Sequence, residues 1–299
     1  MNQYILSLSY GKDSLACIEA CHRLGQRIDR IIHAEVWATD TIPADLPPMV
    51  EFKKKADKII KERYGLEVEH ICATRGGYNS HTKSISTQSQ AREKTSNSLI
   101  SVSASQCNEE VGARSSNTEL GSKLTYEKIF YRHNKVKNQI YGFPIMKGNW
   151  CTSELKKATI PNEIQILGIA ADEPERIERH TKPNIILPLV QIGWTEADCR
   201  KWCEENDLLS PIYKDSLRGG CWFCHNQGVG QLRLLRKNYP DLWELLMKWD
   251  NDSPVTFHAD GHTVRDFDKR FALEDEGLIK PNEQFRWDML KYTQLRLDV

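Results

Sequence analysis

The chain has 299 residues, 39% of them hydrophobic, and its 41 basic and 41 acidic side chains give a formal net charge of +0. This length suffices for one large domain or for an α/β domain with an appendage, and the balanced charge excludes a global field that recruits nucleic acid or membrane. No apolar run approaches the roughly 20 residues that cross a bilayer, so we expect a cytoplasmic protein without a membrane partner. Nine cysteines, an odd number, favour reduced thiols, catalysis or metal binding over a disulfide framework.

The first predicted strand ends in a polar turn, and a helical pattern follows to Leu24, with Gly25 as its stop. Small residues keep such a turn open, and the free N–H groups and dipole of a helix N-terminus attract anions. The spacing matches neither Gly-x-x-x-x-Gly-Lys-Ser/Thr nor Gly-x-Gly-x-x-Gly, which disfavours an ordinary P-loop ATPase and a Rossmann dehydrogenase. The turn therefore predicts a phosphate site made of Ser9, Gly11, Lys12, Asp13 and Ser14.

Strands alternate with helices along the rest of the first half. Further strands are predicted at residues 31–36, 66–72, 164–169 and 185–189, and a helix opens at Pro47 and ends at Gly65. This alternation predicts an α/β fold, a doubly wound and mainly parallel five-stranded sheet. Lys53 and its two lysine neighbours are predicted to form a solvated helix face.

Two other regions complete the organisation. Residues 79–122 are polar and lack a sustained apolar period, which predicts a flexible insertion. A helix is expected near residues 126–134. Residues 1–215 are therefore assigned to a nucleotide-binding α/β domain, and residues 216–299 to a helical region packed on it, whose Arg233 and Arg236 lie on a modestly basic, solvated helix face.

Cysteines form the second chemical centre. Cys221 and Cys224 follow paired glycines and are two residues apart, which is typical of metal or cluster ligands. Cys151 opens a predicted helix, where the dipole is expected to lower the pKa of its thiol and favour thiolate. A fourth ligand from Cys203 or His225 would close a tetrahedral zinc site.

Several of these segments, in chain order, resemble the PP-loop ATP pyrophosphatases and the phosphoadenosine phosphosulfate (PAPS) reductase family of phage and bacterial type. Residues 9–14 resemble the pyrophosphate loop, Ser-Gly-Gly-x-Asp-Ser or Ser-x-Gly-Lys-Asp-Ser. Asp40 and Thr41 resemble the Asp-Thr segment that follows the second strand. Residues 151–156 resemble a Cys-Cys-x-x-x-Lys region, with Thr152 in place of the second cysteine.

Residues 168–176 resemble the Gly-Ile-Arg-x-Asp-Glu-x-x-Arg segment of the same proteins. Ala170 replaces the usual arginine, which leaves Lys156, Arg176 and Arg179 as candidate anion contacts. The Gly-Cys-x-x-Cys segment and the leucine- and arginine-rich helix after it resemble the C-terminal part of the family.

The resemblance implies an adenine nucleotide alpha hydrolase-like fold and a set of site residues. It implies catalytic roles for Lys12, Asp13 and Cys151. Metal ligands would be Cys151, Cys221 and Cys224, holding a [4Fe-4S] cluster with one open iron as in sulfur-inserting PP-loop enzymes, or alternatively Zn²⁺; we favour the cluster. The residues that bind the nucleotide would be Ser9, Gly11, Lys12, Asp13, Ser14, Asp40, Thr41, Lys156, Asp172, Glu173 and Arg176.

Three functions follow from this resemblance. The first is a transferase that binds ATP with Mg²⁺ and activates a substrate by forming AMP and PPi for sulfur-related transfer. Its acceptor is unidentified, with tRNA and DNA as candidates. The second is a PAPS or APS reductase, an oxidoreductase that releases sulfite, although residues 292–299 supply no Glu-Cys-Gly-like tail. The third is a nucleotide-binding regulator without turnover, and a homodimer stays open in each case.

Overall fold

Five parallel strands form the main sheet of the computed structural model, which describes residues 2–75, 121–145, 149–214, 219–281 and 285–289. Leu6 in the central strand pairs with Ile31 on one side and with Ile166 on the other. The strand order reverses at this central strand, an arrangement that opens a crevice for ligands at the carboxyl ends of the strands. In spatial order the strands are β3 (Val68–Cys72), β2 (Arg30–Glu35), β1 (Tyr4–Ser7), β6 (Ile164–Ile166) and β7 (Ile185–Ile186).

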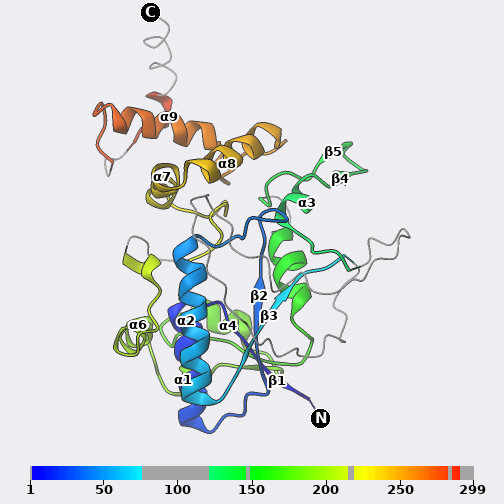
Figure 1. Ribbon diagram of the computed structural model, residues 1–299, viewed down its shortest axis with the longest axis vertical. Coiled ribbons are helices and arrows are strands. Elements are labelled where there is room, and N and C mark those ends of the chain that lie inside the picture. The colour runs from blue at the N-terminus through cyan, green and yellow to red at the C-terminus, as the bar shows by residue number, and fades with distance from the viewer. Residues whose placement is uncertain (1, 76–120, 146–148, 215–218, 282–284, 290–299) are drawn as a thin grey trace, which may run out of the picture.

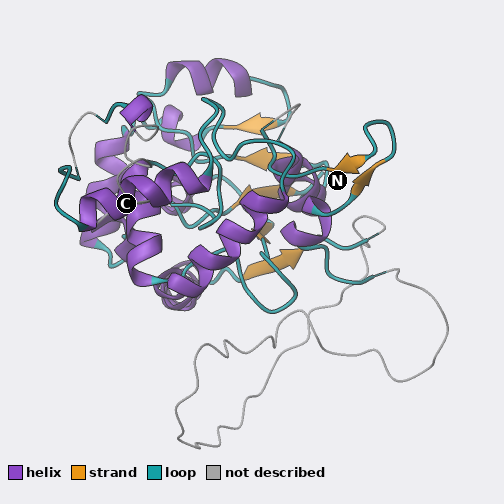
Figure 2. Ribbon diagram, turned by 90° about the horizontal axis from the view of Figure 1, so that it is seen from above, coloured by secondary structure: helices purple, strands orange, loops and turns teal. Residues whose placement is uncertain are grey.

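Helices flank this sheet (Figure 2): α1 (Lys12–Leu24), α2 (Pro47–Tyr64), α4 (Pro174–His180), α5 (Pro188–Gln191) and α6 (Glu196–Glu205). The predicted stops of α1 and α2 are confirmed, because Gly25 and Gly65 adopt the left-handed conformation with φ of 62° and 67°. The predicted five-stranded parallel α/β architecture is confirmed as well. Residues 187–189 do not extend β7, because Pro188 has no N–H to donate and instead starts α5.

A short helix and a β-hairpin occupy the region where one helix was predicted near residues 126–134. The helix α3 (Tyr126–Phe130) ends early, and β4 (His133–Asn134) pairs antiparallel with β5 (Gln139–Ile140). The side-chain oxygen of Asn134 accepts hydrogen bonds from the backbone N–H groups of Val136 and Lys137. This local bonding closes a turn that competes with helix formation.

Three longer helices gather at one end of the molecule (Figure 1): α7 (Val229–Asn238), α8 (Pro240–Asp252) and α9 (Val264–Asp275). The prediction of a solvated basic face on α7 is wrong. Arg233 pairs with Glu274, and Arg236 pairs with Asp268 at 2.8 Å, so the carboxylates of α9 neutralise this face. Short turns of irregular helix complete the chain: η1 (Thr152–Lys156), η2 (Lys157–Thr159), η3 (Pro211–Lys214) and η4 (Trp287–Met289).

Two hydrophobic cores stabilise the fold. One fills the space between the sheet and helices α1, α2, α5 and α6. The other joins α3 to α7, α8 and α9, and includes Trp222 stacked on Trp249 with ring centroids 5.6 Å apart. Trp150 also belongs to this second core, which therefore combines residues from both sides of the predicted domain boundary at 215.

The predicted insertion at 79–122 lies outside the described residues apart from its last two. Across the residues that the structure describes, no helix combines the length and the apolar character needed to cross a bilayer.

Candidate functional site

A pocket of about 570 Å³ lies where the first two strands end. Ser7, Leu8 and Ser9 line it at the end of β1, and His33 lines it from β2. Gly168, which follows β6, closes the same side. The pocket is within the range of about 300–1,000 Å³ that is usual for small ligands, and it occupies the crevice at which the strand order reverses.

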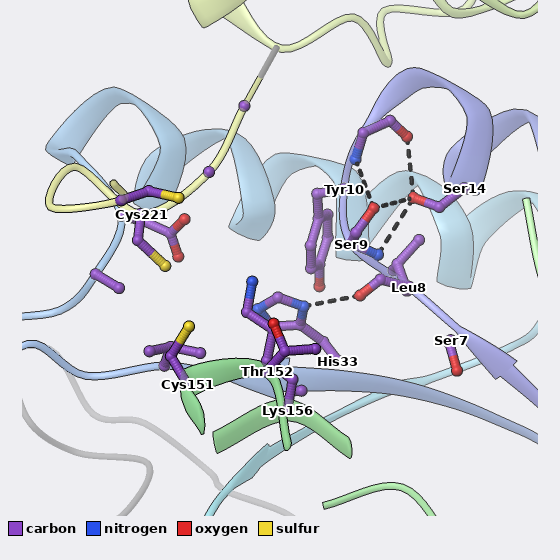
Figure 3. Close-up of a pocket in the computed structure, with 18 of the residues that line it drawn as sticks. Ser7, Leu8, Ser9, Tyr10, Ser14, His33, Cys151, Thr152, Lys156 and Cys221 are labelled. Atoms are coloured by element: carbon purple, nitrogen blue, oxygen red, sulfur yellow. Dashed lines mark hydrogen bonds between the residues drawn. The ribbon is translucent and has the colours of Figure 1, made fainter. Parts of the chain in front are cut away.

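One end of this pocket, the loop end, is made by residues 9–14 (Figure 3). The hydroxyls of Ser9 and Ser14 lie 3.0 Å apart, and the N–H of Ser9 donates to the Ser14 hydroxyl at 3.2 Å. The N–H of Gly11 points to the Ser9 hydroxyl at 3.4 Å. Because α1 begins directly after Gly11, hydroxyls, backbone N–H groups and a helix N-terminus converge at this end, as an anion requires.

Tyr10 holds the loop end in a strained conformation. Its φ is 57°, in the left-handed region that favours glycine, and its side chain is fully buried. The Tyr10 hydroxyl contacts Asp57 and lies 3.0 Å from Nε2 of His70, and burial followed by the Asp57 charge raises the pKa of Tyr10 far above its ordinary value. Anchoring from α2 and β3 thus keeps a non-glycine residue in this backbone conformation.

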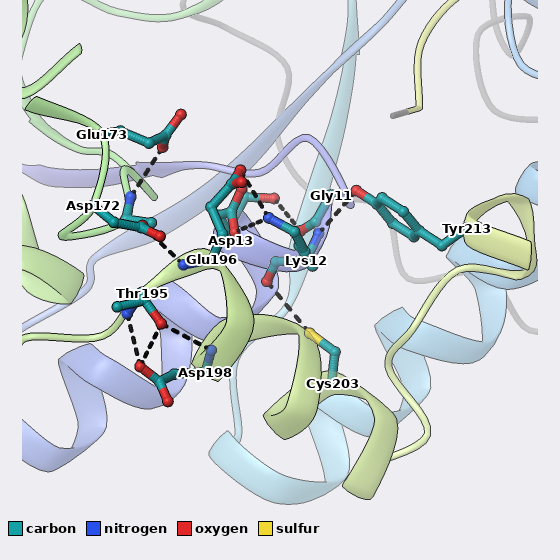
Figure 4. A network of polar contacts seen from close by, with 12 residues as sticks. Gly11, Lys12, Asp13, Asp172, Glu173, Thr195, Glu196, Asp198, Cys203 and Tyr213 are labelled. Carbon is teal, nitrogen blue, oxygen red and sulfur yellow. Dashed lines mark hydrogen bonds and ion pairs between the residues drawn. The ribbon is translucent and has the colours of Figure 1, made fainter. Parts of the chain in front are cut away.

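The side chain of Lys12 does not line the pocket and instead forms ion pairs at its outer side (Figure 4). Its ammonium lies 2.7 Å from Asp13 and 3.0 Å from Glu196. Burial alone would lower the pKa of Lys12, but these two carboxylates raise it. Asp13 itself lines the pocket, and burial raises the pKa of Asp13 in spite of the Lys12 charge, with Glu196 and Glu173 adding to the effect.

The other predicted nucleotide contacts are divided between the pocket and the surface. Arg176 lines the pocket and is held by Glu173, whose carboxylate also accepts the N–H of Ala170 at 3.1 Å. Asp172 accepts the backbone N–H of Glu196 at 2.9 Å. The structure does not bring Asp40, Thr41 or Arg179 to the pocket. Asp40 and Thr41 are both exposed, and Asp40 pairs with Lys128 at 2.6 Å. Arg179 donates to the backbone carbonyl of Glu175 in its own helix.

The opposite end of the pocket, the thiol end, carries Cys151, Cys221 and Cys224 together with Lys156 and His225. Figure 3 shows Cys151 and Cys221 on the side away from Ser9 and Ser14. Cys151 directly precedes the π-helical turn η1, whose wider spacing lets Cys151 and Lys156 face the same pocket. Cys221 and Cys224 share a tight turn in which the N–H of Cys224 donates to the Cys221 carbonyl at 3.0 Å.

The thiols are surrounded by apolar groups, and this overturns the expectation that the pKa of Cys151 is lowered. Burial raises the pKa of Cys151, although Lys156 opposes the shift, and burial raises the pKa of Cys221 to about 12. The predicted lowering by a helix dipole is therefore wrong for Cys151, because the aromatic core around it outweighs one short helical turn. Lys156 is exposed to solvent, and the proximity of Cys221 and Cys151, which attract its ammonium when they ionise, raises its pKa although desolvation opposes the shift.

Tyr126 places a hydroxyl at the thiol end, where it has no hydrogen-bond partner among the residues that the structure describes. Its side chain is only 1% exposed, and its pKa is raised well above the ordinary value by burial and by the nearby Cys151, Cys224 and Cys221. A buried polar group without a partner costs about 1–3 kcal/mol. An absent group that accepts a hydrogen bond at this place would remove that penalty.

A polar cluster at the wall of the pocket, made of Lys53, Asp45 and His33, was missed from the sequence. Lys53 is 6% exposed, and its ammonium contacts Asp45 and lies 2.7 Å from Nε2 of His33. The predicted solvated face is therefore wrong for Lys53. The signal was present, because Lys53 follows Met49 by four residues and precedes Ala56 by three, positions of the buried stripe of α2.

Of the two proposed fourth ligands, only one is near the thiols. His225 lines the thiol end. Cys203 is fully buried on α6 behind the loop end, and its thiol contacts the Lys12 carbonyl at 3.3 Å, so it is wrong as a partner of Cys151. Among described residues, the ligand atoms of Asp13, Glu173 and Glu196 all lie within 4.8 Å of one another, whereas the sulfurs of Cys151, Cys221 and Cys224 are not gathered as closely.

Comparison with protein-family models, with curated proteins and with solved structures gives no match for this chain.

Proposed function

We propose that the chain is a PP-loop enzyme of the PAPS reductase type that binds an adenine nucleotide, ATP, in this pocket and activates an acceptor for sulfur transfer. The proposal rests on one observation, which is that a polar turn and a group of cysteines line the same cavity. An anion-binding turn stands at the loop end, and three cysteines stand at the thiol end. A nucleotide that spans the pocket would present its phosphates to the first and the reacting acceptor to the second.

The loop end would act by stabilising charge on the phosphates. The hydroxyls of Ser9 and Ser14 and the N–H of Gly11 now bond to one another, and they would exchange those bonds for phosphate oxygens. Arg176, which also lines the pocket and pairs with Glu173, would add a guanidinium. An acceptor oxygen bonds to the α-phosphorus while the bridging P–O bond breaks and PPi leaves with its charge stabilised by these donors.

Sulfur enters in the second half of the reaction. A hydrosulfide nucleophile attacks the activated acceptor carbon, the bond between that carbon and the phosphoryl oxygen breaks, and AMP leaves with the oxygen. Lys156 faces the pocket beside the cysteines, where its ammonium would hold the anionic nucleophile and the leaving AMP. Lys12, in contrast, would not contact the phosphates, since its ammonium is paired outside the pocket. It would instead position the carboxylate of Asp13, which lines the pocket.

For the thiol end we propose an iron–sulfur cluster, with zinc as the alternative. Zinc–sulfur bonds of about 2.3 Å in a tetrahedral site bring the sulfurs to within about 4 Å of one another, whereas cluster ligands bind separate irons and stand farther apart. The three sulfurs are not gathered within 4.8 Å. The partnerless Tyr126 hydroxyl also suits a buried group with sulfide acceptors. Cys151, Cys221 and Cys224 would hold a [4Fe-4S] cluster, which would supply an iron without a protein ligand for the sulfur chemistry.

Metal analysis after anaerobic purification tests the thiol end. We expect iron and acid-labile sulfide in the native protein, loss of both in Cys221→Ala, and retention of both in the control Cys203→Ala, whose thiol is buried away from the pocket. Stoichiometric zinc without iron in the native protein would refute the cluster.

ATP–PPi exchange in the presence of candidate acceptors tests the loop end. Ser14→Ala removes a hydroxyl that faces the pocket and is expected to lower exchange on the order of 100-fold, as loss of one preorganised donor does. The control Ser153→Ala removes an exposed hydroxyl that bonds only to its own helix and is expected to leave exchange unchanged. Tight ATP binding without exchange for any acceptor would instead favour a regulator.

A further inference from the structure

The β4–β5 hairpin projects from the body of the protein in both views (Figures 1 and 2). Residues 135–139 at its tip are all exposed, and Val136 is 95% exposed, the most exposed of the large hydrophobic side chains among the described residues. The side chain of Val136 is thus almost entirely accessible to solvent. The tip is therefore available to a partner.

The charge of this hairpin differs from that of the chain as a whole. Residues 131–141 contain Arg132, Lys135 and Lys137 and no aspartate or glutamate, while the whole chain has a net charge of +0. Arg132 is paired with Glu154. Lys135 and Lys137 flank Val136, and neither pairs with a carboxylate in the described part of the chain. The tip thus presents two unneutralised ammonium groups around an exposed methyl surface.

The hairpin is joined to the thiol end by short connections. Arg132, at the base of β4, contacts Glu154 at 2.7 Å, and Glu154 lies in the same π-helical turn as Lys156. On the other side, α3 leads directly from Tyr126, which lines the thiol end, into β4. A polyanion held by the tip would therefore lie on the side of the molecule where the thiols are.

We infer that the β4–β5 hairpin docks double-stranded DNA by inserting its tip into the major groove. A two-stranded β-ribbon fits the major groove of B-form DNA, whereas the major groove of A-form RNA is too deep and narrow for side chains to read. The ammonium groups would meet phosphates on the groove walls. Val136 would contact thymine methyls, and the exposed amide of Gln139 matches the adenine edge.

This inference rests on the proposed function in one respect, which is that DNA would be the acceptor of the sulfur transfer. Docking itself requires neither nucleotide nor cluster. The two can therefore fail separately, and the binding experiment below is carried out on the full chain without ATP.

The test compares full-length variants in binding to a duplex DNA of mixed sequence as salt is varied. Lys135→Gln with Lys137→Gln removes two phosphate contacts and is expected to reduce the slope of log K against log salt by about 1.8, which is roughly 60-fold in affinity at about 0.1 M salt. The matched control, Lys58→Gln with Lys201→Gln, removes two equally charged lysines, each 76% exposed on other helices. It is expected to bind as the native protein does.

Three results would overturn the inference. They are the absence of duplex DNA binding by the native protein, an unchanged salt slope in the hairpin variant, and tighter binding of duplex RNA or of single strands than of duplex DNA. Circular dichroism and ATP binding by the same variants show that the fold and the loop end are intact. DNA binding that depends on the hairpin without any ATP binding would refute the proposed function and leave the docking surface standing.

Discussion

The two ends of the pocket are built in different ways. The loop end is one contiguous stretch, residues 9–14, whose hydroxyls and N–H groups bond to one another. The thiol end is assembled from three distant segments that contribute Tyr126, Cys151 and Cys221. The first is polar and preformed, and the second is apolar with a buried hydroxyl that lacks a partner. The comparison teaches that the geometry of the loop end is encoded by neighbouring residues, while that of the thiol end depends on the packing of the second core.

Lys53→Met removes the buried cation beneath the pocket and is expected to destabilise the protein most. Asp45 and His33 lose their shared partner, and breaking a buried ion pair costs about 3 kcal/mol. The free energy of unfolding in urea measures the loss. The neighbouring Lys54→Met, on the exposed side of the same helix, should change it by less than about 0.5 kcal/mol; equal effects of the two substitutions would contradict the buried network.

Gly168→Ala is expected to disturb the loop end and to leave the thiol end unchanged. A Cβ at this position would lie 2.6 Å from the Asp13 carbonyl oxygen, so the start of α1 must shift, at about 1–3 kcal/mol. We expect weaker ATP binding with the cysteines' metal content unchanged. Gly230→Ala, in α7, is the control and should leave both unchanged, because the added carbon would meet no atom within 4 Å apart from its chain neighbours and the backbone of its own helix.

Stability should fall in acid because His33 is buried in its neutral form. Burial, followed by the charge of Lys53, lowers the pKa of His33 well below its ordinary value. The unfolded chain therefore binds the proton more readily, and the free energy of unfolding falls as pH drops below about 6.5, by about 2 kcal/mol at about pH 5. Urea unfolding at both pH values measures it, and His33→Gln should lose this part of the pH dependence; an identical pH profile would show that His33 is not its source.

Tyr126→Phe gives the smallest effect and probes the thiol end alone. In metal-free protein the substitution removes a hydroxyl without a partner, so the free energy of unfolding should rise by up to about 1 kcal/mol. Iron retention in the anaerobically purified protein should fall. Tyr131→Phe, which removes a hydroxyl bonded to Asp252, should instead lower stability by about 1 kcal/mol. Equal loss of stability in both variants would show that the Tyr126 hydroxyl has a partner.

Local pattern was sufficient for the sheet and for the loop end. Alternating strands and helices, with Gly25 and Gly65 as stops, predicted the observed parallel sheet because these signals depend on residues close in sequence. The helix predicted near 126–134 failed because Asn134 closes a turn with its own side chain. For Lys53 the spacing from Met49 and Ala56 did indicate the buried stripe of α2, but its buried ammonium is accommodated by Asp45 and His33, which come from other elements.

The sequence by itself determined that a polar turn with two serines and a glycine follows the first strand and that a Cys-x-x-Cys segment lies far from it, since residue type and short spacing decide both. Only the tertiary structure decided that the two share one pocket, that Cys203 lies outside it, and that the ammonium of Lys12 faces away. Such relations depend on which strand ends and helices the fold brings side by side. Long-range packing sets that arrangement, and no local spacing encodes it.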